Sequence, residues 1–389
     1  MKSYYLLQNQ RIKIKKSKRN KNILNIRNAG IDLMRIIGMY DIVLFHILID
    51  SNIYYKYRQY KNQLKYLEVF TNWHISNFGI ISGIVNFRNN RSLKYANIIY
   101  LWLLVTFYSL SIHFYYNKKY RPRISSSYKI KYFFPVVFNN HWYFSSYFGM
   151  YLFLPIINRG ILYLTKKEFE FIVFSIIFII ILWKDYNIKN STDNNDPFNM
   201  NSGRSMIGLI VFYIIGAYIG KYVIEGNKNK KIYYYLICIF IFVFSGYLCN
   251  YYLNHNGKNN FEILLRNLFG FRLNSVAMVS QTISLNLLFS QIKYNKYISK
   301  MISFFGKLAF GVYIIHDHID IRYIIFKDLF KNYAYNLKIK FVLLLVFQKA
   351  LKYFSFCILI EFLRLLIFNL FRVKKLCMYI DKLINIHFT

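Results

Sequence analysis

Apolar runs of roughly 20 residues recur along the chain from residue 31 to residue 371. A helix of that length is long enough to cross the hydrocarbon core of a bilayer, which is about 30 Å thick. The sequence therefore predicts an all-α integral membrane protein with about ten transmembrane helices in one bundle. The expected spans are residues 31–49, 73–87, 96–115, 142–163, 169–184, 204–223, 232–252, 273–292, 302–319 and 341–370.

The segments between the apolar runs are strongly basic, and the formal net charge of the chain is +36. In a soluble protein such a charge would favour nucleic-acid binding, because clustered Lys and Arg neutralise phosphates. Here the aromatic residues lie inside the apolar runs and the basic residues lie between them, so the charge is expected at the membrane surface, where anionic lipids attract it. We expect the lipid bilayer as a partner and no nucleic acid.

The charge pattern also predicts how the chain is divided and oriented. Residues 1–28 form a basic tail that runs into the first apolar run without a small-residue cleavage site, so we expect it to be retained. Residues 29–371 form the membrane domain, and residues 372–389 form a second short basic tail. An even number of spans places both tails on one side, and the positive-inside bias, although weak, makes that side the cytoplasm.

The first apolar run contains ionisable residues that are costly inside a bilayer. Arg35 and His46 are eleven residues apart, which on a helix is three turns plus about 20°, so they lie on one face roughly 16 Å apart along the axis. Asp41 points away from that face. Arg35 is either an anchor at the membrane surface or a functional cation. His46 lies deeper, where an ionisable ring usually faces a cavity or a partner, and histidine is the side chain best suited to move a proton near neutral pH.

Later runs supply further candidates, each with a structural alternative. His316, in "YIIHDHID", is either a hydrated helix end or an acceptor-binding residue. Glu361 can pair with Arg364 on the same helical face, or it can orient His46. Trp142 suits a stacking platform for sugar rings, although Trp at the start of a span more often belongs to the interfacial aromatic belt.

The cysteines and four of the glycines are expected to have structural roles. The four cysteines show neither metal-ligand spacing nor a paired framework, so they are expected to be packing residues, and no metal site is expected. Glycines four residues apart in two of the runs predict close helix packing. They are Gly79 with Gly83, and Gly216 with Gly220.

Five segments, in order over residues 29–318, resemble the membrane acyltransferase-3 family, the bacterial integral-membrane O-acyltransferases that act on surface glycans and related acceptors. The first carries the Arg and His with ten residues between them, and the third and fifth carry Trp142 and Tyr313. The segments are "GIDLMRIIGMYDIVLFH", "ISNFGIISGIVNFRNNRSLKY", "FFPVVFNNHWYFSSYFGMYLFLPIIN", "GLIVFYIIGAYIG" and "FGKLAFGVYIIHDH". Asp41 departs from the resemblance, because the family is normally apolar at that position.

The resemblance implies transfer of an acyl group, usually acetyl from acetyl-CoA, to a hydroxyl of a glycan or lipid-linked sugar, with no tightly bound cofactor. It implies a multi-pass protein of the bacterial cytoplasmic membrane. His46 is then the expected base, which deprotonates the acceptor hydroxyl. Arg35 is the second expected catalytic residue, and it holds the phosphates of CoA. Arg88 and Arg91 are the expected additional donor-binding residues. The expected acceptor-binding or supporting residues are Trp142, Tyr313, His316 and Glu361.

A flippase or exporter of lipid-linked glycan is a second hypothesis, since such a protein would also be polytopic, basic and rich in aromatic residues. A transporter more often shows internal symmetry or Gly/Pro-broken helices in both halves, and neither is visible in this sequence. A glycan polymerase is a third hypothesis, but a large polar external loop would be expected of it. The longest expected loops have only about 20 to 25 residues.

Overall fold

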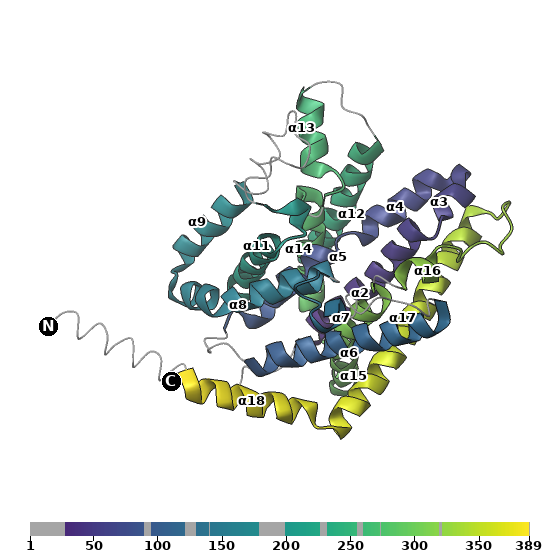
Figure 1. Cartoon of the computed structure of the whole chain (residues 1–389). Coiled ribbons are helices and arrows are strands. Elements are labelled where there is room, and N and C mark those ends of the chain that lie inside the picture. Colours follow the sequence, from purple (N-terminus) through teal and green to yellow (C-terminus); the bar gives the residue numbers. More distant parts are fainter. Residues whose placement is uncertain are drawn as a thin grey trace.

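The computed structural model describes residues 28–88, 95–120, 130–139, 141–178, 199–225, 232–254, 260–272, 274–318 and 321–388. Every regular element in these ranges is helical, which confirms the all-α class (Figure 1). A helix lies in each of the ten expected ranges. These helices are α2 (Ala29–Asp50), α5 (His74–Asn86), α6 (Tyr95–Tyr120), α8 (Trp142–Tyr163), α9 (Lys166–Ile176), α11 (Met206–Tyr218), α12 (Ile232–Asn254), α14 (Val276–Ser290), α15 (Lys296–His316) and α17 (Ile339–Leu370).

Short helices lie between them: α3 (Ile53–Lys56), α4 (Lys61–Thr71), α7 (Ile130–Phe133), α13 (Asn260–Phe269) and α16 (Arg322–Phe326). A further helix, α18 (Val373–Phe388), follows α17. Short non-α helical turns occupy Arg58–Tyr60, Asn201–Gly203 and Ile219–Ile224. Most of the predicted N-terminal tail, residues 1–27, and the end of the predicted fifth span, residues 179–184, lie outside the described residues.

Among the described residues, five helices are long and apolar enough to cross a membrane: α6, α11 with its continuation Ile219–Ile224, α12, α15 and α17. Less than a third of the apolar window of α12 and of α17 is buried, so both present large hydrophobic side chains outward, as lipid-facing helices do. The expected count of ten spans is therefore not confirmed. α2 has 22 residues but is not in this group, because every stretch of 18 residues in it contains three charged side chains. The charged residues are Asp32, Arg35, Asp41 and Asp50.

α2 lies in the middle of the bundle, in contact with α5, α14, α15 and α17 (Figure 1). Its apolar residues belong to two of the buried clusters, with Val43, Leu44 and Ile47 fully buried in the larger one. A hydrogen bond joins α2 to α5: the side-chain amide of Asn77 in α5 donates to the carbonyl oxygen of Met34 at 3.2 Å. Because α2 carries Arg35 and His46, its central position places both side chains inside the protein.

The four glycines predicted to allow close packing lie where α5 crosses α11. A Cβ added at Gly83 would lie 2.0 Å from the carbonyl oxygen of Tyr213, and one added at Gly216 would lie 2.1 Å from that of Ile80. No larger residue fits at either position without moving a helix backbone. The prediction of close helix contact at these glycines is confirmed.

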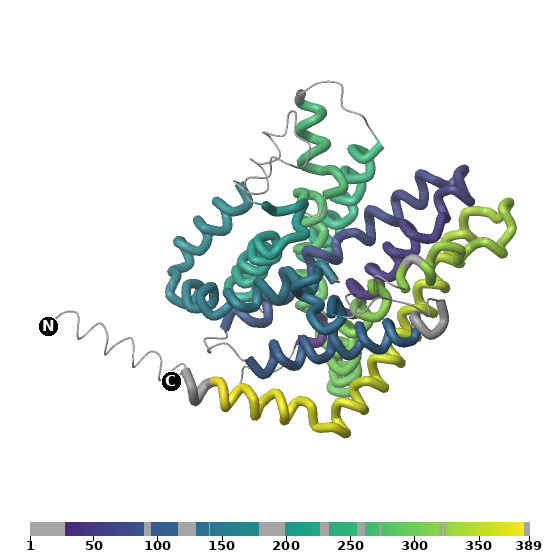
Figure 2. The backbone as a smooth tube through the Cα atoms, viewed as in Figure 1, coloured from purple at the N-terminus to yellow at the C-terminus, as the bar shows by residue number. Residues whose placement is uncertain are grey.

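The chain turns sharply between α17 and α18, as the tube in Figure 2 shows. Arg372 adopts a positive φ of 51° at this bend, which ends α17. Residues 373–388, predicted as part of a short basic tail, form α18, which packs along α6. The four cysteines are free and buried, in agreement with a packing role.

Candidate active site

The N-terminus of α2 is fixed to the end of α14. The side chain of Asn28 caps α2 by accepting from the backbone N–H of Gly30 at 2.9 Å, and it donates to the carbonyl oxygen of Ser290 at 2.9 Å. Gly30 is required here, since an added Cβ would lie 1.9 Å from the carbonyl oxygen of Phe289. The rotation of α2 about its axis, and with it the direction of its polar face, is thereby set.

One helical turn further on, Arg35 forms an ion pair with Asp32. The carboxylate of Asp32 also accepts from the hydroxyl of Ser303 on α15 at 2.8 Å. Asp32 is buried, whereas the side chain of Arg35 keeps 22% of its surface exposed. The guanidinium of Arg35 is therefore held by a buried carboxylate, while part of the side chain stays exposed.

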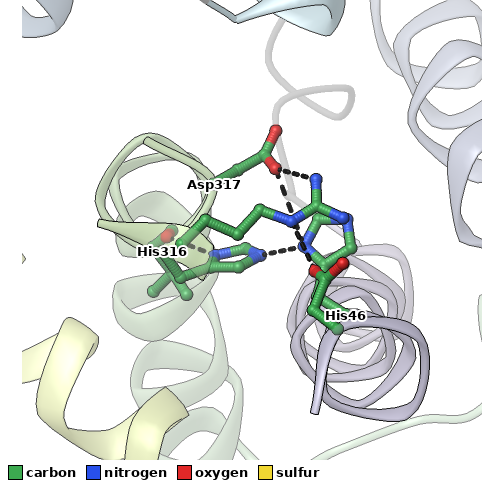
Figure 3. A network of polar contacts seen from close by, with 6 residues as sticks. His46, His316 and Asp317 are labelled. Carbon is green, nitrogen blue, oxygen red and sulfur yellow. Dashed lines mark hydrogen bonds and ion pairs between the residues drawn. The ribbon is translucent and has the colours of Figure 1, made fainter. Parts of the chain in front are cut away.

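At the other end of the α2–α15 pair, two histidine rings meet (Figure 3). Nδ1 of His46 lies 3.2 Å from Nε2 of His316, and Nδ1 of His316 lies 2.7 Å from the carbonyl oxygen of Val312. Both rings are buried. The sequence predicted a role for each histidine but not that they would touch.

These contacts assign the proton positions when both rings are neutral. A carbonyl oxygen only accepts, so Nδ1 of His316 carries the hydrogen and donates to Val312. Nε2 of His316 is then the acceptor for Nδ1–H of His46. The remaining nitrogen, Nε2 of His46, keeps its lone pair, and no described residue forms a hydrogen bond with it. His46 thus has the tautomer that a general base needs.

A carboxylate lies behind the pair. Oδ1 of Asp317 lies 3.7 Å from Nδ1 of His46, beyond hydrogen-bond distance but close enough to stabilise a positive charge on the ring. Arg322 donates to Asp317 at 2.6 Å and to Asp50, at the end of α2, at 2.7 Å (Figure 3). This network fixes Asp317 beside His46 and links α2 to the segment that follows α15.

A cavity of about 450 Å³ joins the two ends of α2, and both Arg35 and His46 line it. The prediction that they share one helical face is confirmed, and Asp41 is absent from the lining. The lining also includes Trp142, Tyr313 and Arg204. The volume lies within the range of small-molecule and cofactor sites. A ligand in this cavity can contact a cation at one end and a basic nitrogen roughly 16 Å away.

The other predicted residues lie elsewhere. Arg88, at the end of α5, forms an ion pair with Glu225 and does not line the cavity, and Arg91 lies outside the described residues. Glu361 is buried against α15, where it accepts from the hydroxyl of Tyr108 at 2.7 Å and pairs with Arg364. Of the two roles predicted for Glu361, the ion pair is the one seen, since the hydrogen-bond partner of His46 is His316.

Sequence reasoning missed four residues of the site: His74, Arg204, Asp317 and Arg322. Asp317 adjoins a predicted histidine, and a carboxylate beside two histidines was a signal that could have found it. Arg204 and Arg322 lie at the starts of helices, where no pattern of spacing relates them to α2. Among the described residues, no three His, Cys, Asp or Glu side chains are grouped closely enough to hold a metal ion.

Comparison with known families decides the class of this protein. The family model of the acyltransferase-3 group, described as an acyltransferase domain, matches residues 28–367. The chain belongs to the acyltransferase-3 family. The match covers α2 through nearly all of α17, so the cavity and both histidines of this acyltransferase lie inside it. No curated protein and no solved structure gives a significant match to the chain.

Proposed function

We propose that this membrane acyltransferase is an O-acetyltransferase that moves an acetyl group from cytoplasmic acetyl-CoA to a hydroxyl of a surface glycan or lipid-linked sugar. The observation that carries the proposal is the cavity that connects Arg35 with the His46–His316 pair. It provides a phosphate-binding cation and a base in one continuous space. Family membership favours group transfer over the export of lipid-linked glycan.

The Arg35 end of the cavity suits the donor. The guanidinium of Arg35 is anchored by Asp32, the side chain as a whole is partly exposed, and a planar guanidinium binds phosphate oxygens in pairs. The pantetheine arm of CoA is long and narrow, and the cavity is lined by α2 residues from Arg35 to Ile49. With the phosphates at Arg35, the thioester reaches toward His46. Arg88 and Arg91 stay proposed as additional donor-binding residues, although Arg88 does not line this cavity.

The His46 end suits the chemistry. Nε2 of His46 takes the proton of the acceptor hydroxyl as its oxygen attacks the thioester carbonyl carbon, and the imidazolium that forms is stabilised by Asp317. The tetrahedral intermediate then collapses, the carbon–sulfur bond breaks, and the CoA thiolate recovers the proton from His46. His316 is the positioning residue, because it holds Nδ1–H of His46 and so keeps Nε2 free.

Aromatic side chains around His46 are suited to a sugar. Trp142, at the start of α8, and Tyr313, on α15, line the same cavity. A sugar ring presents a face of C–H groups that packs on an aromatic ring, while its hydroxyls need hydrogen-bond partners. We assign Trp142 and Tyr313 to acceptor binding, with Glu361 supporting α15 from behind.

The test is acetyl transfer by membranes that contain the full chain. Membranes are incubated with radiolabelled acetyl-CoA, and label is measured on glycan and lipid-linked sugar. His46→Ala is expected to lower the rate by about 100-fold or more, because it removes the base. Asp41→Asn is the matched control on the same helix, and it is expected to retain the wild-type rate, because Asp41 does not line the cavity.

Protein levels are matched by immunoblot. Transfer by His46→Ala at the wild-type rate would contradict the assignment of the base. Absence of label from all wild-type extracts, together with acceptor accumulating on the inner leaflet of a deletion strain, would favour an exporter.

A further inference from the structure

Arg204 lines the same cavity as His46 and is not needed by the chemistry proposed above. Its side chain is exposed yet lines the cavity, as His46 and His74 also do. In the part of the chain that the structure describes, no carboxylate forms an ion pair with it. Arg35 and Arg322, the other arginines of the lining, are both paired.

The backbone before Arg204 holds it in place by an unusual turn. Asn201 and Ser202 have positive φ values of 44° and 54°, and Gly203 has a φ of 92°. Left-handed conformations of non-glycine residues cost free energy and persist only where surrounding contacts impose them. Here Met200 is fully buried, and its carbonyl oxygen accepts from the N–H of Gly203 at 2.8 Å. Arg204 is thus presented by a constrained turn.

A buried hydroxyl on the cavity wall has no partner. Tyr143 lines the cavity, and its phenolic oxygen has no hydrogen-bond partner among the described residues. A buried polar group without a partner costs free energy, so native proteins rarely keep one unless a ligand or water completes it. The cavity therefore offers a ligand the cation of Arg204 and the hydroxyl of Tyr143.

We propose that the acceptor carries an anionic group, a carboxylate or a phosphate, that binds Arg204 and orients the neighbouring sugar hydroxyl toward His46. The inference rests on the proposed O-acetyltransferase function and specifies its substrate class. A neutral glycan would leave Arg204 unpaired in the complex, whereas an acidic sugar unit pairs with it while its ring packs against Trp142. Arg204 then selects acidic acceptors and takes no part in the proton transfer.

The first test uses the glycans of cells in which the full chain is wild type, Arg204→Gln, Arg159→Gln or His46→Ala. Surface glycans are separated by anion exchange, and ester-linked acetyl groups are located by mass spectrometry. Esters are expected on sugar units that carry a carboxylate or phosphate, and Arg204→Gln is expected to lose most of them. Arg159→Gln is the charge-matched control, since Arg159 is exposed on α8 and lies outside the cavity lining.

Esters confined to neutral units would overturn the inference. Equal esters in wild-type and His46→Ala cells would instead overturn the proposed function itself, so the two failures are distinguishable.

The second test measures kinetics with protein reconstituted in liposomes. The isolated acidic glycan is compared with the same glycan after its carboxylates are reduced to alcohols, and in a parallel arm after its phosphates are removed with hydrogen fluoride. Removing the responsible anion is expected to raise the wild-type acceptor KM by about 10- to 100-fold, the range for a charge-assisted hydrogen bond. The arm that shows the effect identifies the anion.

With Arg204→Gln, the native and neutralised glycans are expected to have similar KM values, and Arg204→Lys is expected to fall between Arg204→Gln and the wild type. The KM for acetyl-CoA is expected to stay the same in all of these variants. If Arg204→Gln kept the full wild-type preference for the anionic glycan, Arg204 would not be its binding partner.

Discussion

His46 is the side chain on which the proposed chemistry depends most, and His316 determines which of its nitrogens can act. His316 is tied through Nδ1 to its own helix, so its Nε2 is left to accept from His46. The base is therefore oriented by a second histidine, and the carboxylate of Asp317 lies at the edge of the pair.

Replacing His316 tests this orientation. His316→Ala is expected to lower kcat by about 10- to 100-fold, because His46 loses the acceptor that fixes its tautomer, while the KM for acetyl-CoA stays near the wild-type value. His316→Gln is expected to recover part of the loss, since an amide oxygen can accept from Nδ1–H. The rates are measured with reconstituted protein. Equal activity of His316→Ala and wild type would show that the His46 ring needs no partner.

Sequence alone placed Arg35 and His46 on one face, because a helical period depends only on spacing. It also named His316, but it left open whether Glu361 or another residue would orient His46. That choice depends on how α15 and α17 pack against α2, and no local pattern encodes it. Arg204 was missed because its importance comes from a turn with positive φ and from a cavity, both of which appear only in three dimensions.

At the scale of elements, α5 and α11 cross at glycines whose missing side chains bring two backbones together. This contact supports the wall of the cavity to which α5 contributes His74, Phe78 and Ser82. Sequence predicted the crossing from the four-residue spacing, because small residues at that interval form a flat strip on one helix face. It did not say which two helices would meet.

Gly216→Leu is expected to separate the two helices and to lower the free energy of unfolding by about 1–3 kcal/mol, the usual cost of overpacking. The measurement is thermal unfolding of detergent-solubilised protein. Gly160→Leu is the control, because nothing lies within 4 Å of the position that its Cβ would take. Equal melting temperatures for the two variants would mean that the α5–α11 contact does not constrain the bundle.

At the scale of the whole molecule, the proposal places the Arg35 end of the bundle in the cytoplasm and the His46 end outside. Tyr297, at the start of α15, lies at the Arg35 end and is 82% exposed. Tyr55, on α3, lies at the His46 end and is 75% exposed. All four native cysteines are buried, so labelling of an introduced cysteine has little background.

In spheroplasts, a membrane-impermeant maleimide is expected to label Tyr55→Cys directly and Tyr297→Cys only after lysis. The positive-inside bias behind this orientation is weak in the sequence, since basic residues flank both ends of many helices. The opposite labelling pattern would place acetyl-CoA and Arg35 on different sides of the membrane and would contradict the proposed donor site.

α2 and α15 are held together at both ends, by Asp32 with Ser303 at one and by the two histidines at the other. In a protein that carries substrates by alternating access, helices on the two sides of the site separate at one end in each cycle. Here opening would separate His46 from the residue that orients it. In the proposed reaction the bundle would then act as a fixed barrier: the nucleotide carrier and the acceptor would each stay in their own compartment, and only the two-carbon fragment would change sides.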